Sequence, residues 1–240
     1  MRATPADIEA AIAELADPVR AEGSARFFKT GPGQYGEGDR FIGVTVPQLR
    51  AVAKRFRGVD AATVDRLLAS EIHEYRLAGL LLMRAEFERA PDDPTRRGWV
   101  DQYLGALAEG RVNNWDLVDA SADPVLGAWL VRRGDHGKLV ELASEPDLWM
   151  RRAGIVGTFA FLKHGVGEAT LAVVPVVIDD RRDLIQKATG WMLREMGKRV
   201  DRDLLTSYLA DHAPRMGRTA LSYAIEHLEA DERAHYRSLR

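Results

Sequence analysis

The sequence has no cysteine among its 240 residues, which excludes disulfide bonds, thiolate metal sites and a thiol nucleophile. It also has no apolar run near the roughly 18 residues that a membrane-spanning helix needs, and residues 1–15 lack the apolar core of a signal peptide. These absences predict a cytoplasmic protein. The hydrophobic fraction of 46% and the charged fraction of 29% are typical of a globular chain that can bury a sizeable core.

Motifs that identify nucleotide-binding proteins and common hydrolases are missing too. There is no P-loop, no GxGxxG sequence and no Ser-His-Asp constellation. The histidines are scattered without the spacing of a metal site, so we expect structural or surface roles for them and no bound metal. They are His73, His136, His164, His212, His227 and His235.

The chain also lacks a large excess of charge of either sign. Its net charge of −2 argues against a uniformly basic nucleic-acid-binding protein. Residues 147–202 contain ten Lys and Arg against seven Asp and Glu, a local charge of +3 that leaves −5 for the rest of the chain. This modest asymmetry is a weak indication of a polyanionic partner.

Helical periodicity dominates the sequence, and no useful length of it alternates with the period of two that strands show. The Gly-rich residues 31–38 cannot continue a helix, and residues 41–46, although β-branched, are expected to be an extended linker. The sequence therefore predicts an all-α protein. The expected helices span residues 4–16, 19–28, 48–56, 61–69, 74–90, 95–109, 114–121, 124–133, 136–143, 147–163, 167–178, 182–198, 202–212 and 217–229.

A repeated helix opening indicates how these helices are organised. Four helices begin with a long polar residue two positions before an alanine, and successive openings near the C-terminal end are 35 and 32 residues apart. The alanines are Ala78, Ala153, Ala188 and Ala220. Two helices per unit of this length predict a HEAT-like solenoid, in which one helix of each pair lines a concave groove. We expect a single domain over residues 1–240, with N-terminal helices and the Gly-rich loop in 1–46 and the helical repeats in 47–230.

The most informative stretch is residues 111–119 (RVNNWDLVD), near the middle of the chain. Asn113 or Asn114 can cap the helix that follows. Trp115 and Asp119 are four residues apart, so a helix places them on one face. An indole beside a carboxylate is typical of a functional site. The alternative is that Trp115 anchors the core and Asp119 interacts with the helix dipole.

The repeat predicts which other side chains face the groove. The position before the anchoring alanine is occupied by Arg152 and Lys187, and its counterpart in the middle unit is Trp115. Trp191 lies four residues after Lys187, and Asp119 lies four residues after Trp115. Arg152 and Lys187 are suited to neutralise phosphates, and the indoles are suited to pack on bases or sugars. These side chains predict that the concave groove is a DNA-binding groove. A carboxylate weakens the binding of a polyanion, so we expect Asp119 to act on the positive charge that develops when a glycosidic bond breaks.

These residues resemble the DNA alkylation repair glycosylase family, whose members are built of HEAT-like repeats. The similarity runs over residues 24–228. It is carried by residues 41–47 (FIGVTVP), 115–119 (WDLVD), 149–153 (WMRRA) and 185–195 (IQKATGWMLRE), of which the last is the most specific.

The resemblance implies the excision of N3- and N7-alkylated purines from duplex DNA, without a metal or cofactor and without deep extrusion of the base. On the matching positions, Asp119 is the catalytic carboxylate, Trp115 and Trp191 flank the deoxyribose, and Arg152 contacts the DNA backbone. The net charge and the lack of an exposed heptad pattern favour a monomer.

Further DNA contacts are expected at Lys187, Thr45 and Tyr35, although a solvated loop is an equally good interpretation of Tyr35. The sequence departs from the family pattern in two respects. The Gly-rich stretch resembles an insertion, and Asp183 and Leu184 stand where the family can carry aromatic residues. An acidic residue there is expected to weaken DNA contact or to shift the lesion preference.

Two other functions fit the same residues. A HEAT-like scaffold would bind a protein partner, with Trp115 and Trp191 as interface anchors. A non-catalytic relative would hold damaged DNA without cutting it. Replacing Asp119 by Asn separates these hypotheses, because it should abolish excision in an enzyme while leaving DNA binding intact.

Overall fold

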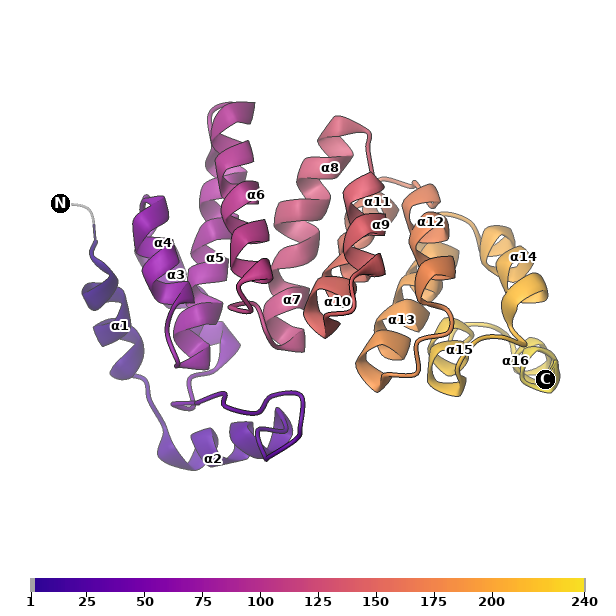
Figure 1. Cartoon of the computed structure of the whole chain (residues 1–240), viewed down its shortest axis with the longest axis horizontal. Coiled ribbons are helices and arrows are strands. Elements are labelled where there is room, and N and C mark those ends of the chain that lie inside the picture. The colour runs from indigo at the N-terminus through magenta and orange to yellow at the C-terminus, as the bar shows by residue number, and fades with distance from the viewer. Residues whose placement is uncertain (1–2, 240) are drawn as a thin grey trace. The chain divides into compact units, whose positions relative to one another are not determined.

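A computed structural model describes residues 3–239, which form helices joined by short connections (Figure 1). Among these residues, β structure is limited to an isolated bridge between Arg40 and Ile72. The predicted all-α, helical-repeat fold is confirmed. The chain divides into two compact units, Met1–Ser121 and Ala122–Arg240, and the single domain expected from the sequence stays a prediction. None of the helices in the described part of the chain is both long and apolar enough to cross a membrane.

The helices of the first unit begin where capping residues are available. Thr4 and Asp7 form a capping box at the first helix, and the Thr4 N–H donates to Asp7 Oδ2 at 2.8 Å. Asp60 and Asp92 each accept the backbone N–H three residues further on, at 2.9 Å. The helices are α1 (Pro5–Ala13), α2 (Pro18–Phe27), α3 (Val46–Arg55), α4 (Ala61–Leu68), α5 (His73–Arg89), α6 (Asp93–Ala108) and α7 (Trp115–Ser121).

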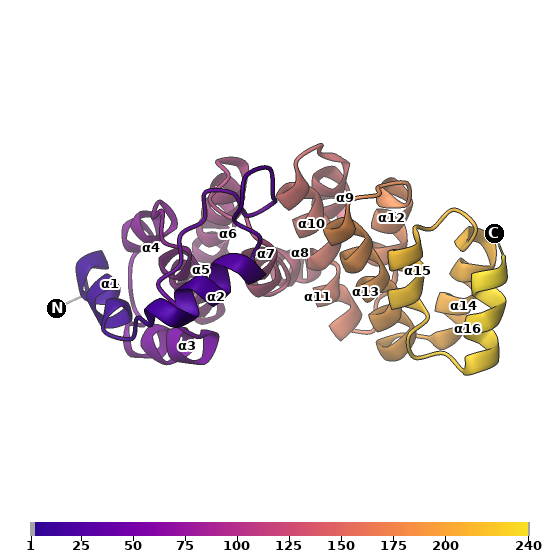
Figure 2. The same ribbon diagram turned by 90° about the horizontal axis from the view of Figure 1, so that it is seen from below.

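α2 differs from its neighbours because it buries none of its ten residues. It lies across the ends of α3–α7 rather than beside them, as the two views agree (Figures 1 and 2). The connection from α2 to α3 contains the Gly-rich stretch. The part of this connection that follows the Gly-rich stretch packs against the first turn of α5 through Asp39 and Gly43.

In the second unit, the first difference from the predicted helices is at Pro124. Proline has no N–H to donate to the preceding turn, and its ring crowds the carbonyl four residues earlier. The expected helix over 124–133 is wrong in its first half, because the segment Ala122–Gly127 adopts π-helical geometry before α8 begins.

A second departure divides the expected helix over 147–163 at Thr158. The Thr158 hydroxyl donates to the Ile155 carbonyl at 2.7 Å, and α10 ends where α11 begins. The last predicted helix ends early, at Ala224, and a further helix follows it that the periodicity did not indicate. The helices are α8 (Ala128–Arg133), α9 (Gly137–Ser144), α10 (Leu148–Gly157), α11 (Phe159–Lys163), α12 (Glu168–Val177), α13 (Asp183–Arg199), α14 (Arg202–His212), α15 (Arg218–Ala224) and α16 (Ala230–Ser238).

The repeated helix opening has a repeated structural role. The four alanines are buried, and three of them are fully enclosed. In three of the helices the polar side chain two positions earlier reaches back to a carbonyl of the preceding loop, which satisfies a backbone acceptor. These hydrogen bonds join Arg76 to Ser70 at 2.9 Å, Arg151 to Glu145 at 2.9 Å and Gln186 to Arg181 at 3.0 Å. A groove shared by these helices stays a prediction.

Candidate functional site

α7 carries two of the predicted site residues. The Val118 N–H donates to the Asn114 carbonyl at 3.1 Å, so Asn114 is the residue from which the helix starts. Leu117 and Val118 are fully buried, whereas Trp115 and Asp119 are half-buried. One helix face therefore presents an indole and, one turn further on, a carboxylate, as their spacing predicts.

Asp119 lies near a phenol of the core. Burial raises the pKa of the Tyr103 hydroxyl above its usual range, and the negative charge of Asp119 acts in the same direction. The Tyr103 side chain is fully enclosed. Its hydroxyl therefore stays neutral, and the charge on this side of α7 is that of the carboxylate.

Trp115 lies at the edge of a group of packed rings, which we call the ring cluster (Trp115, Phe28, Phe41 and His73). The indole stacks on Phe28 with centroids 5.2 Å apart and planes 15° apart. Phe28 stacks on Phe41 at 4.9 Å, and Phe41 stacks on His73 at 4.4 Å. One face of the indole is therefore covered within the protein, so a ligand of Trp115 must approach its edge or its other face. The sequence analysis missed Phe28, for which the only signal was a pair of adjacent aromatic residues before the Gly-rich stretch.

His73, the first residue of α5, lies between two carboxylates. Its Nδ1 is 2.9 Å from Asp39 Oδ2 and its Nε2 is 2.8 Å from Asp116 Oδ2, and 2% of its side chain is exposed. Asp39 also accepts hydrogen bonds from the Arg76 guanidinium and, at 2.8 Å, from Asn114 Nδ2. This network ties the end of the Gly-rich stretch to both α5 and α7.

The network shifts the pKa values of its members in opposite directions. Burial lowers the pKa of His73, but hydrogen bonds with Asp116 and Asp39 outweigh it and raise the pKa from 6.5 to about 9. Burial raises the pKa of Asp39, but the hydrogen bond from His73 and the charge of Arg76 outweigh it and lower the pKa from 3.8 to about 2. Both groups are therefore charged at neutral pH.

Glu74, the next residue of α5, fixes the extended segment that follows the Gly-rich stretch. Its buried carboxylate accepts the backbone N–H groups of Ile42, Gly43 and Val44 at 2.7 to 3.2 Å. Gly43 has a φ of +82°, and a Cβ at this position would lie 2.1 Å from the Asp17 carbonyl oxygen. A buried carboxylate and a glycine thus hold the linker that the sequence predicts.

Two predicted DNA contacts, Thr45 and Tyr35, flank this segment. Thr45 caps α3, with its hydroxyl 2.6 Å and its N–H 2.9 Å from Gln48 Oε1. Tyr35 is half-buried in the Gly-rich stretch, and Lys29 Nζ lies 5.7 Å from its ring centroid. Their roles in DNA binding stay predictions.

In the second unit, Arg152 lies on α10, which packs against α13. Its exposed fraction is 5%, and its Nη1 donates to the Leu184 carbonyl at 2.6 Å. The guanidinium therefore links α10 to the first turn of α13. The repeat predicts a groove-lining cation here, and the structure adds that Arg152 is largely enclosed and has a packing role of its own.

Lys187 and Trp191 lie one turn apart on α13. Lys187 Nζ is 2.8 Å from Asp183 Oδ2, with the two side chains 41% and 56% exposed. Trp191 is half-buried, and its ring centroid lies 5.7 Å from that of Phe159. Asp183, one of the departures from the family pattern, thus pairs with the lysine that was expected to meet a phosphate.

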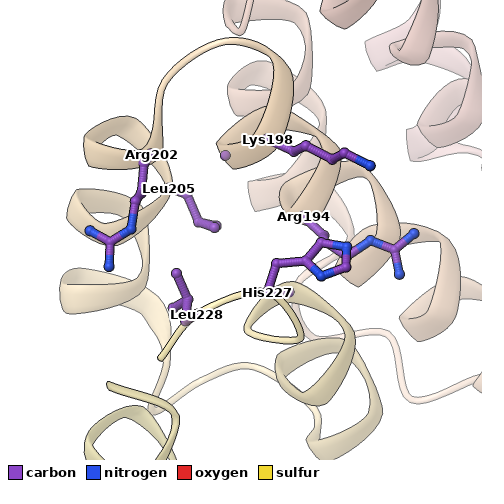
Figure 3. A pocket seen from close by; sticks show the side chains of 8 residues that line it. Arg194, Lys198, Arg202, Leu205, His227 and Leu228 are labelled. Carbon is purple, nitrogen blue, oxygen red and sulfur yellow. The ribbon is translucent and has the colours of Figure 1, made fainter. Parts of the chain in front are cut away.

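A cavity of about 330 Å³ opens at the end of α13, and none of the predicted site residues lines it. Leu205 and Leu228 form part of its apolar wall, and Figure 3 shows Arg194, Lys198 and His227 together on one side. Glutamates pair with two of the three Arg and Lys side chains that line it. The cavity is therefore amphipathic rather than strongly cationic. Within residues 3–239, no three His, Asp or Glu side chains are grouped so as to hold a metal ion.

The fold and the site residues place the chain in a class of all-helical repeat proteins. One helix face presents an indole and a carboxylate, and other helices carry basic and aromatic residues. A family model described as DNA alkylation repair enzyme matches residues 8–228. The chain therefore belongs to the DNA alkylation repair enzyme family. Membership supports a role in DNA repair, with an enzymatic activity and with DNA as the partner.

Among solved structures, one similar chain is described as a predicted DNA alkylation repair enzyme from Enterococcus faecalis. The TM-score is 0.67 with 15% sequence identity, and the match covers 90% of this chain and 97% of that chain. At this identity the likeness shows a shared fold. A search of curated proteins found no match.

Proposed function

We propose that this member of the family is a DNA glycosylase that hydrolyses the N-glycosidic bond of N3- and N7-alkylated purines in duplex DNA. The observation that carries the proposal is the face of α7 on which Trp115 precedes the half-buried carboxylate of Asp119 by one turn. A surface that only binds a polyanion gains nothing from a carboxylate, whereas a reaction that develops positive charge does.

The proposed mechanism needs no general acid, and the positive charge of the leaving group is the reason. A purine alkylated at N3 or N7 is cationic, so breaking its bond to C1′ returns the bonding electron pair to the purine, which leaves neutral. The sugar becomes an oxocarbenium-like cation that the Asp119 carboxylate stabilises. Water then attacks C1′, and its proton passes to Asp119 and on to solvent. Loss of one such electrostatic partner typically costs on the order of 10²–10³ in rate.

The aromatic and basic residues position the DNA in this proposal. Trp115 and Trp191 pack against deoxyribose, and the stack on Phe28 fixes the plane of the first indole. Arg152 and Lys187 neutralise phosphates. The lesion is not drawn into a deep pocket, and the enzyme acts as a monomer without metal or cofactor.

The test is the release of free base from a duplex that contains one N7-methylguanine, measured under single-turnover conditions with wild type and Asp119→Asn. We expect the substitution to reduce release by at least about 10²-fold. The Kd for the same duplex should stay unchanged or fall, because a negative charge near phosphates is removed. Asp101→Asn is the matched control, since Asp101 forms an exposed ion pair with Arg97 on α6.

Each other outcome has a definite meaning. Binding of the duplex without release by wild type would point to a protein that holds damaged DNA without cutting it. Neither binding nor release would point to a scaffold for a protein partner. Release that Asp119→Asn leaves intact would place the catalytic carboxylate elsewhere.

A further inference from the structure

We propose that His73 is a positioning residue: as an imidazolium it clamps the Gly-rich stretch to the start of α7 and thereby fixes the indole of Trp115 beside Asp119. We call Asp39, His73 and Asp116 together the His73 clamp. The inference rests on the proposed glycosylase function. It assigns His73 a role in that function: the side chain is buried, and it acts on Trp115 and Asp119 through the residues that it contacts.

The geometry of the clamp requires the charged ring. A neutral imidazole has one N–H, but both nitrogens of His73 lie within 2.9 Å of a carboxylate oxygen. A neutral ring would leave a nitrogen lone pair facing either Asp39 or Asp116, in a site where 2% of the side chain is exposed. The imidazolium donates to both carboxylates.

The charges that face the ring balance only when it carries a proton. Asp39 directly follows the Gly-rich stretch, Asp116 belongs to α7, and Arg76, which binds Asp39, belongs to α5. The other acid of this turn, Glu74, is directed at backbone N–H groups of the extended segment. Two carboxylates therefore face one guanidinium and one imidazolium, and loss of the His73 proton leaves one uncompensated negative charge in a buried cluster.

The clamp holds the backbone of Trp115 from both sides. Asp116, the next residue, accepts from His73 and, through its other oxygen, from the Leu117 N–H at 2.9 Å. Asn114, the preceding residue, donates to Asp39 and accepts the Trp115 N–H at 2.9 Å. The first turn of α7 is thus fixed by two side chains that share the clamp.

The ring cluster provides a second connection between His73 and Trp115. Phe28 lies between the two rings, with its centroid 5.2 Å from that of Trp115 and 5.1 Å from that of His73, and Phe41 stacks on both Phe28 and His73. Both aromatic residues belong to the connection that Asp39 anchors. Releasing Asp39 therefore frees the cover of the indole as well as the start of the helix that carries it.

The protonation state is tested first, by ¹⁵N NMR of the imidazole nitrogens in the full-length protein, with His73→Gln to assign the signals. We expect both nitrogens of His73 to be protonated at neutral pH and to lose a proton only near pH 9. One bare nitrogen at neutral pH would overturn the proposal.

The positioning role is tested by single-turnover release of N7-methylguanine from duplex DNA. We expect His73→Gln to slow release about tenfold or more, because a displacement of about 1 Å at a positioned group costs on the order of 10²-fold. The Kd for DNA should change by less than about threefold, since His73 is enclosed and meets no phosphate. His164→Gln, at an exposed position in the second unit, is the control and should match wild type.

A role in stability alone predicts something else. It would leave the release rate of the folded variant and its pH profile unchanged. Positioning predicts a wild-type rate that falls as pH rises through about 9 and an earlier fall in Asp116→Asn, in which the ring has lost one of its two negatively charged partners. Should His73→Gln fail to fold, Asp116→Asn makes the same test with the ring in place.

The two proposals fail in distinguishable ways. A wild-type protein that releases no base would overturn both the glycosylase function and the positioning role. Wild-type release that His73→Gln and Asp116→Asn leave unchanged would overturn the positioning role alone.

Discussion

Alkaline pH should remove a defined part of the stability of the first unit, and His73→Gln should abolish that dependence. The folded protein binds the His73 proton more tightly than the unfolded chain, because both ring nitrogens have carboxylate partners. The stabilisation is therefore fully present below pH 6.5, the value of a free imidazole, and declines as pH rises to about 9, the pKa in the folded state.

The magnitude follows from the shift. A change in pKa from 6.5 to about 9 corresponds to roughly 3 kcal/mol at 1.36 kcal/mol for each unit. The ring is almost completely buried, so little of this is lost to screening by solvent. The free energy of unfolding should fall with a slope of up to about 1.4 kcal/mol per pH unit in this window.

Urea unfolding of wild type and His73→Gln at a series of pH values between about 6 and 9.5 measures the effect. The difference in unfolding free energy between the two proteins should shrink by roughly 3 kcal/mol from the acidic to the alkaline end. The series stops at about pH 9.5 because a tyrosine in the unfolded chain ionises near its usual pKa of 10.0, whereas burial raises the pKa of Tyr103 and Tyr208 in the folded protein. At higher pH this difference would add a second pH dependence to the free energy of unfolding. His164→Gln should follow wild type. Parallel pH curves for wild type and His73→Gln would refute the charged clamp.

Three further predictions concern the DNA-binding residues and the Gly-rich stretch. Asp183→Asn releases Lys187 from its ion pair and should tighten duplex binding about fivefold, which corresponds to about 1 kcal/mol of charge interaction with the DNA. The slope of log K against log salt should steepen by about 0.9, and an unchanged slope would mean that Lys187 does not contact the DNA. Arg152→Ala should flatten that slope if the guanidinium meets a phosphate, and it should also lower stability by about 1–3 kcal/mol because the Leu184 carbonyl loses its donor, which thermal unfolding would measure. Gly36→Ala should destabilise the first unit by about 1–3 kcal/mol, because a Cβ there would lie 2.3 Å from the Phe28 carbonyl oxygen, whereas Gly98→Ala, with open space around it on α6, should be neutral or stabilising.

Features that depend on near neighbours in the chain could be predicted from the sequence. The capping box of Thr4 and Asp7 and the helical periodicity involve residues three or four positions apart, where helix geometry alone determines contact. The same rule places Trp115 and Asp119 on one face. The repeated alanines predict a helical-repeat fold because small residues permit close helix contact, and all four are buried.

Some local predictions were wrong where one residue overrides the periodicity. Pro124 fits the hydrophobic pattern of its segment but lacks a donor, and a π-helical segment replaces the predicted start of a helix. Thr158 bonds to the carbonyl three residues earlier and divides another predicted helix. Periodicity reports which face is apolar and does not report whether each backbone hydrogen bond can form.

By itself the sequence determined most of the helices, the repeat and the placement of an indole and a carboxylate on one helix face, because these follow from spacings of a few residues. Only the tertiary structure decided what surrounds that pair. Asp39 and Asp116 meet His73 across separations of 34 and 43 residues, and Phe28 covers one face of Trp115. Such contacts depend on the path of the chain through space, and the charge state of a histidine depends on the partners that this path brings to both of its nitrogens.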